Sequence, residues 1–197
     1  MTKKAKTTHN IHEFLEERWS PRAFRDEKID LEKLAGLFEA ARWSPSASNL
    51  QPWYYIVGMK GDETYSRIME CLVEFNQMWA GSAPVLCLTI GDSKNPKGED
   101  YSNFQYDIGQ SIAHLTFQAH SEGLFIHQMS GIYPEKAKKL FDIPEQYEVL
   151  TAFVIGYLGD PEILHPRMQK SEIAERERKD LDTFVFQNKF GEKASFI

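Results

Sequence analysis

The order of apolar and polar residues divides the chain into alternating helical and extended stretches. Apolar residues at helical spacing predict helices over residues 10–20, 30–43 and 64–75. Asn10 followed by Glu13 has the form of a capping box, so the first helix should begin at Asn10. It should end near Ser20, because the residue before a proline avoids the helical region.

The second half of the chain predicts a long helix over residues 105–122 and a short one over 134–141. Gly123 follows the long helix, where a left-handed residue is common. Short apolar runs predict strands over residues 53–57, 85–90, 124–129 and 149–158. The chain shows no internal repeat and no second apolar unit, so we expect one domain that mixes helices and strands.

The C-terminal part changes character twice. Residues 160–177 are polar and charged, and residues 181–186 are apolar again. An isolated apolar segment must be buried somewhere. It either returns as an edge strand of its own sheet or adds to a partner subunit.

Composition limits the partners. The 197 residues are 42% hydrophobic, enough for one domain core without disulfides. The net charge of −6 argues against nucleic acid as a partner, although a local basic cluster can still hold one phosphate. No long apolar run suggests a secretory signal or membrane span, so we expect a flexible tail over residues 1–9 and a cytoplasmic location.

Cysteine and histidine positions do not predict redox or metal chemistry. Cys71 and Cys87 lie in apolar stretches without a C-x-x-C pair, which is typical of buried reduced thiols. His114 and His120 share a helix but stand about 240° apart around its axis, unsuited to joint metal ligation. Phosphate-loop, nucleophile-elbow and G-x-G-x-x-G motifs do not occur either.

The first candidate site is the basic sequence where the first helix ends. Arg18 and Arg22 flank Ser20, and two guanidiniums with a hydroxyl between them suit a phosphate monoester. The alternative is a solvated turn in which the arginines pair with Glu16 or Glu17.

Two further segments carry candidate binding groups. Residues 45–53, Pro-Ser-Ala-Ser-Asn-Leu-Gln-Pro-Trp, offer hydroxyls, amides and backbone N–H groups to a planar heterocycle, or form a turn that satisfies its own backbone. Residues 128–131 end a strand, a common place for ligands in proteins that mix strands and helices. Asp107 is expected to favour its helix dipole, and the nearby aromatics Tyr101, Phe104 and Tyr106 either shape a substrate slot or pack in the core or an interface.

Together, these segments resemble the nitroreductase family of FMN enzymes over residues 10–186. The most specific match is Ser-Pro-Ser-x-Ser-Asn-x-Gln-Pro-Trp, which follows an Arg-x-Ser-x-Arg turn. The resemblance implies an α+β sandwich with a central, mostly antiparallel sheet flanked by helices. It also implies an intertwined homodimer with FMN at the interface. Residues 10–197 would form the single FMN-binding domain, with a C-terminal arm over about 178–197.

The resemblance assigns residues to each part of FMN. The phosphate and ribityl chain would be held by Arg18, Ser20 and Arg22, by the backbone of Trp19, and by Arg178 or Arg176. The other subunit would contribute Pro45, Ser46, Ser48 and Asn49, with Gln51 close behind. The isoalloxazine ring would be lined by Gln128, Met129 and Gly131. Many family members carry a basic residue in place of Trp19, and an acidic residue or glycine in place of Ser130.

The implied activity is reduction of small electron-poor acceptors, such as nitroaromatics or quinones, by NADPH or NADH in a ping-pong sequence. FMN would carry the chemistry, so no catalytic acid or base is assigned. The alternatives are other flavin chemistry on the same fold, such as dehydrogenation, dehalogenation or flavin fragmentation, and a non-catalytic FMN-binding protein.

Overall fold

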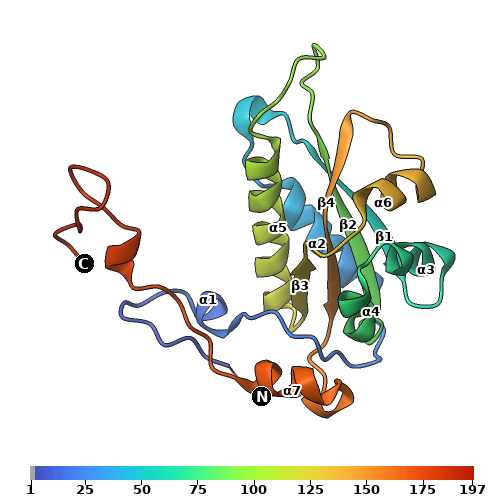
Figure 1. Ribbon diagram of the computed structural model, residues 1–197, viewed down its shortest axis with the longest axis horizontal. Helices are drawn as coiled ribbons and strands as arrows, with labels where there is room; N and C mark the ends of the chain where they lie inside the picture. The colour runs from blue at the N-terminus through green and yellow to red at the C-terminus, as the bar shows by residue number, and fades with distance from the viewer. Residues whose placement is uncertain (1–2) are drawn as a thin grey trace.

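A four-stranded antiparallel sheet forms the centre of the protein in the computed structural model, which describes residues 3–197 (Figure 1). Its order is β1-β2-β4-β3, and every neighbouring pair is antiparallel. The strands are β1 (Trp53–Met59), β2 (Val85–Asp92), β3 (Phe125–Met129) and β4 (Tyr147–Gly156). The predicted α+β sandwich with a central antiparallel sheet is confirmed.

Helices cover both faces of this sheet (Figure 1). On one face lie α2 (Leu31–Arg42) and α5 (Phe104–Ser121). On the other lie α3 (Glu63–Glu70), α4 (Glu74–Ala80) and α6 (Pro134–Leu140). Helix α7 (Pro166–Ile173) lies beyond the end of β4, and its Met168 packs into the core of this face (Figure 1). The short elements are α1 (Glu13–Glu17), η1 (Ala47–Asn49), η2 (Pro161–Ile163) and η3 (Leu181–Thr183).

The alternation along β2 explains the two cores. Leu86 and Leu88 pack with α3 and α4, whereas Val85 and Cys87 pack with α2 and α5. These β2 side chains are fully buried, so the strand reads as a continuous apolar run. Cys71 and Cys87 are buried and free, as the sequence predicts.

Some predicted boundaries are wrong. The first helix is capped by His12 rather than Asn10, because the His12 ring accepts the Phe14 N–H at 3.2 Å. The predicted helix over residues 64–75 is two helices, α3 and α4. The chain breaks between them at Val73, whose backbone N–H bonds to the Gly131 carbonyl instead. Gly123, at φ +73°, ends α5 as predicted.

Both ends of the chain run beside each other, away from the sheet (Figure 1). Lys3 lies 4.3 Å from the Trp19 ring centre, and Ala5 donates a backbone hydrogen bond to Glu16. Met1 and Thr2, in the predicted flexible tail, lie outside the described residues. Residues 181–186 contain η3 and form no strand of the sheet. The prediction that this segment returns as an edge strand of its own sheet is therefore wrong.

Candidate functional site

An arginine-lined cavity of about 950 Å³ opens between the two ends of the chain. Arg18, Arg176 and Arg178 line it, so residues from the first helix and the C-terminal segment meet here. Burial lowers the pKa of the Arg18 guanidinium, and the positive charge of Arg178 lowers it further. Like charges gathered in a partly dry cavity favour an anionic ligand.

The carboxylates that could neutralise Arg18 are engaged elsewhere. Glu16 pairs with Lys4 at 2.8 Å, and Glu17 lies 3.9 Å from the His120 ring. Among residues 3–197, neither Arg18 nor Arg178 forms an ion pair. Within residues 3–197, Arg18 and Arg22 form no ion pair with Glu16 or Glu17, the pairs that the alternative of a solvated turn requires.

Arg176 and Arg178 differ in how they are used. The Arg176 guanidinium donates to the backbone carbonyls of Glu16 and Arg18. It thereby ties the C-terminal segment to the end of α1. Arg178 donates only to the carbonyl of its own neighbour, Glu177, and stays available to a ligand in the cavity.

Arg22 faces away from this cavity. Its guanidinium lies 3.8 Å from the carboxylate of Glu172, a residue of α7 that is 1% exposed. Glu172 also accepts the backbone N–H groups of Arg22 and Ala23, at 2.6 and 3.1 Å. The sequence pattern gave no sign of this carboxylate, since residues 160–177 look like a solvated crossing.

The turn between Arg18 and Arg22 is anchored to the edge strand β3. Trp19 is buried, with its ring 6.4 Å from that of Phe125, so a ligand can reach only its backbone. Ser20 is exposed. The carbonyl of Pro21 lies 2.9 Å from the Nδ1 of His127, a bond between the turn and the middle of β3.

At the end of β3, the backbone approaches α4 closely. The Gly131 carbonyl accepts the Val73 N–H at 3.1 Å and the Asn76 side-chain amide at 2.9 Å. A Cβ on Gly131 would lie 2.7 Å from that amide, which explains the glycine. Gln128 is exposed, whereas the Met129 side chain is in the core and leaves only its backbone for a ligand. Sequence reasoning missed Asn76.

The serine-rich loop is held in an uncommon backbone conformation. Ser48, Asn49 and Gln51 have φ values of 52°, 56° and 50°, in the left-handed region that most side chains disfavour. The Ser46 hydroxyl accepts the Gln51 N–H at 3.0 Å. Pro45 and these three residues are exposed, so their polar groups face outward from the subunit.

A buried carboxylate of α5 accepts a hydrogen bond from the backbone of this loop. Asp107, in the first turns of α5, is 2% exposed. It accepts the Ala47 N–H at 3.1 Å and the hydroxyl of Tyr101. Asp107 therefore positions the loop in addition to its expected place near the helix dipole. Phe104 is in the core and Tyr106 is exposed.

The loop and the arginine cavity lie at opposite ends of α5. The loop bonds to Asp107, whereas the region of Arg18 meets His120, whose ring centre is 5.5 Å from that of Phe14. Roughly 13 helical residues separate these points, a distance of about 20 Å. One chain does not bring the two predicted groups of binding residues together.

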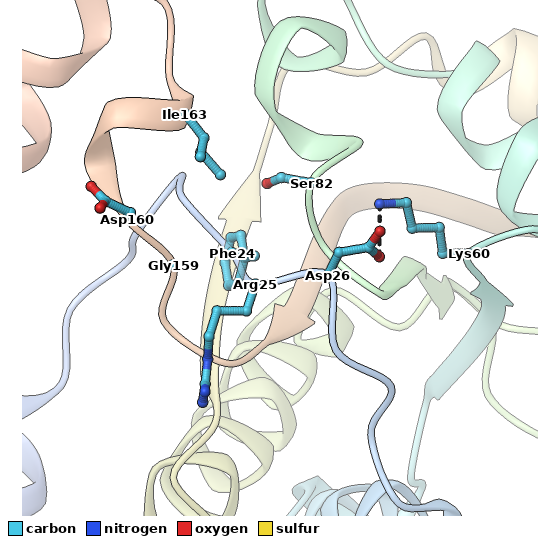
Figure 2. A pocket seen from close by; sticks show the side chains of 8 residues that line it. All are labelled: Phe24, Arg25, Asp26, Lys60, Ser82, Gly159, Asp160 and Ile163. Carbon is cyan, nitrogen blue, oxygen red and sulfur yellow. Dashed lines mark hydrogen bonds and ion pairs between the residues drawn. The ribbon is translucent and has the colours of Figure 1, made fainter.

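A second cavity, of about 450 Å³, contains none of the predicted residues (Figure 2). Its cations are already paired, Lys60 with Asp26 at 3.0 Å and Arg25 with Glu27 at 3.1 Å. In the part of the chain that the structure describes, no three metal-ligating side chains gather, and none of the helices has the length and apolar character to cross a bilayer. The arginine cavity, together with the Arg18–Arg22 turn that connects it to β3, is therefore the best candidate site.

The fold is an α+β sandwich, and the candidate site is a cavity lined by three arginines. A family model described as the nitroreductase family matches residues 15–85. A Streptomyces coelicolor protein with the provisional name NADH dehydrogenase/NAD(P)H nitroreductase is 35% identical over 163 residues, covering 71% of this chain and 78% of that protein. The chain belongs to the nitroreductase family.

Solved structures of the same fold match this chain closely. A crystal structure described as an oxidoreductase containing FMN superimposes with a TM-score of 0.91 at 31% identity, covering 98% of this chain and 99% of that one. The FMN- and NADPH-dependent nitroreductase NfnB from sphigopyxis sp. strain HMH superimposes with a TM-score of 0.71, covering 90% and 98%. At 17% identity, NfnB shows the shared fold alone.

Proposed function

We propose that this protein is an FMN-dependent oxidoreductase that uses NADPH or NADH to reduce small electron-poor molecules. The observation that carries the proposal is the pair Arg18 and Arg178, which line one cavity and form no ion pair with a carboxylate among residues 3–197. Family membership and the FMN-containing relative support the choice of ligand.

The cavity fits the phosphate end of FMN. A phosphate monoester carries close to two negative charges, which would offset the repulsion between Arg18 and Arg178. Arg176 is already committed to two backbone carbonyls, so we assign the phosphate contact to Arg178 and a positioning role to Arg176. The exposed Ser20 hydroxyl and the backbone of Trp19 continue the site toward β3.

The flavin ring would then lie along the edge of β3, near Gln128, Met129 and Gly131. β3 pairs only with β4, which leaves its other edge free of strand partners. Gly131 lets the end of β3 pack closely against Asn76 of α4, which fixes the backbone at this end of the strand. When bound there, FMN would supply hydride transfer between the nicotinamide and an acceptor such as a nitroaromatic or quinone, while the protein supplies position and electrostatics.

A second copy of the chain completes the site. In one chain, the serine-rich loop lies about 20 Å along α5 from the arginine cavity. Each flavin would therefore need Ser46, Ser48 and Asn49 of another subunit. The C-terminal arm supports the same arrangement, since Phe190 and Phe196 are 93% and 73% exposed in the single chain. Such large apolar side chains are expected to be covered by a partner. We therefore propose a homodimer.

The phosphate assignment is tested by binding FMN and riboflavin, which lacks the phosphate, to the same variants. Arg178→Ala and Arg18→Ala should each raise the FMN Kd about 10- to 100-fold, the value of a lost charged hydrogen bond. Riboflavin binding should change little. The control is Arg167→Ala, which removes the same charge from the exposed surface of α7. Equal FMN affinity in Arg178→Ala and Arg167→Ala would overturn the assignment.

A further inference from the structure

Glu172 is a buried carboxylate in a segment that is mostly polar and charged. It lies near the end of α7 and is 1% exposed. Burying a carboxylate is costly unless hydrogen bonds and a counter-charge compensate. The compensation comes from the turn after Arg18, 150 positions earlier in the chain, through two backbone N–H groups and one guanidinium.

The two oxygens of Glu172 have different surroundings. Oε1 accepts the N–H groups of Arg22 and Ala23, so it fixes the backbone of the turn. Oε2 has no hydrogen-bond partner among residues 3–197 and lies 3.8 Å from the Arg22 guanidinium. The Arg22 Nε also lacks a partner in that part of the chain. Oε1 therefore fixes the backbone of the turn through hydrogen bonds, whereas Oε2 contributes mainly the negative charge that faces the Arg22 guanidinium.

Arg22 itself lies between Glu172 and the edge of β3. Its guanidinium carbon is 5.9 Å from the Trp79 ring centre, and the Trp79 ring lies 4.5 Å, centre to centre, from the tilted ring of His127 in β3. The other cations near Glu172 are Lys3, whose ammonium donates to the Glu172 carbonyl at 2.6 Å, and Arg176 beyond it. Glu172 is thus the anion that offsets Arg22 beside the strand that would carry the flavin.

We propose that Glu172 is a positioning residue for the cofactor site, which fixes the Arg18–Ala23 turn and sets the net charge that Arg22 presents to the flavin. This inference rests on the proposed function. Reduction adds negative charge to a flavin, so an uncompensated cation nearby favours the reduced state. By offsetting Arg22, Glu172 keeps the bound flavin a stronger reductant than Arg22 alone would allow.

Two substitutions separate geometry from charge. Glu172→Gln keeps an amide oxygen that can accept the two N–H groups but removes the negative charge. Glu172→Ala removes both. The matched control is Glu175→Gln, which deletes a carboxylate three residues further along, in an exposed ion pair with Lys6 at 2.5 Å. If Glu172 acts as proposed, only changes at position 172 affect the turn and the flavin.

The turn is measured by amide hydrogen exchange of the protein without added FMN. Glu172→Ala should speed exchange at Arg22 and Ala23 at least about tenfold, because both N–H groups lose their acceptor. Glu172→Gln and Glu175→Gln should stay within about threefold of the original chain. Unchanged exchange in Glu172→Ala would overturn the anchoring role, and this result does not depend on flavin binding.

The charge effect is measured by redox titration of the FMN-loaded protein. Glu172→Gln should raise the equilibrium constant for two-electron reduction about tenfold, a rise of about 30 mV in potential. Glu175→Gln should leave the potential unchanged. Equal potentials for Glu172→Gln and the original chain would overturn the electrostatic role. Failure of the original chain to bind any FMN would instead refute the proposed function and leave the exchange result standing.

Discussion

The Asp107 carboxylate accepts the backbone N–H of Ala47 at 3.1 Å, although the two residues lie 60 positions apart. This bond connects the core-facing side of α5 to a loop in which Ser48, Asn49 and Gln51 all adopt left-handed backbone angles. Such a conformation persists only where surrounding contacts enforce it. Asp107 is therefore the residue on which the outward presentation of the loop depends.

Asp107→Ala should release the serine-rich loop. The substitution leaves the Ala47 N–H and the Tyr101 hydroxyl without their acceptor, and each loss costs about 1–3 kcal/mol if the group stays buried. FMN affinity should fall about tenfold, while the dimer persists. Tyr101→Phe keeps the Ala47 bond and should bind FMN nearly as the original chain does. Unchanged FMN affinity in Asp107→Ala, measured by fluorescence titration, would contradict this role.

Stability should fall in mild acid because of His127. Burial lowers the pKa of His127 from 6.5 to about 4, and the positive charge of Arg22 acts in the same direction. Between these values the unfolded chain binds a proton that the folded chain excludes, so stability rises with pH across this window. The cost is absent above about pH 6.5 and complete below about pH 4, where it reaches roughly 3 kcal/mol.

The measurement is urea unfolding at pH 7 and pH 4.5 for the original chain and for His127→Gln. The glutamine cannot be protonated, so its stability should depend less on pH. A pH profile with the same slope in both proteins would show that His127 is not the responsible group.

Substitution by alanine should change the stability of the fold in opposite directions at Gly58 and Gly36. A Cβ on Gly58 would lie 2.4 Å from the backbone nitrogen of Tyr65, so β1 and α3 would have to separate. Gly58→Ala should destabilise the fold by about 1–3 kcal/mol. A Cβ on Gly36, inside α2, would meet nothing within 4 Å, and Gly36→Ala should stabilise by roughly 0.5–1 kcal/mol. Urea unfolding of the two variants checks both signs.

Deleting residues 181–197 should expose the proposed dimer interface. We expect a colourless protein that aggregates, because Arg178 loses the following η3 segment and the partner loses the arm that would cover it. Size-exclusion chromatography with absorbance detection provides the measurement. A soluble yellow monomer would argue against the dimer.

Apolar periodicity was sufficient to predict where the strands and most of the helices lie along the chain, whereas the central antiparallel sheet was implied by the family resemblance. Each strand of the sheet coincides with an apolar run, and Gly123 follows the end of α5 in the left-handed region, as the sequence predicts. The pattern failed where polar residues are buried or helices are short. The N-cap of the first helix is His12 rather than Asn10. Helix α7 was not predicted, because only Met168 and Glu172 of its residues are buried.

Sequence motifs were sufficient to predict which segments form the candidate site, but not which side chains hold those segments in place. The positions of Arg18 and the serine-rich loop follow from the sequence, whereas the supporting carboxylates Asp107 and Glu172 do not. Buried carboxylates are uncommon, and their partners lie 60 to 150 positions away. Sequence could not separate Arg176 from Arg178 either, because the difference is that Arg176 bonds to backbone carbonyls across the fold.

The most direct test of the proposed function is the absorption spectrum of the purified, FMN-saturated and desalted protein, recorded before and after anaerobic addition of NADPH or NADH. The proposal predicts that the visible bands of oxidised flavin stay with the protein, bleach on addition of the nicotinamide, and return when a nitroaromatic or quinone is added. A colourless protein fraction, with all FMN eluting free, would contradict it.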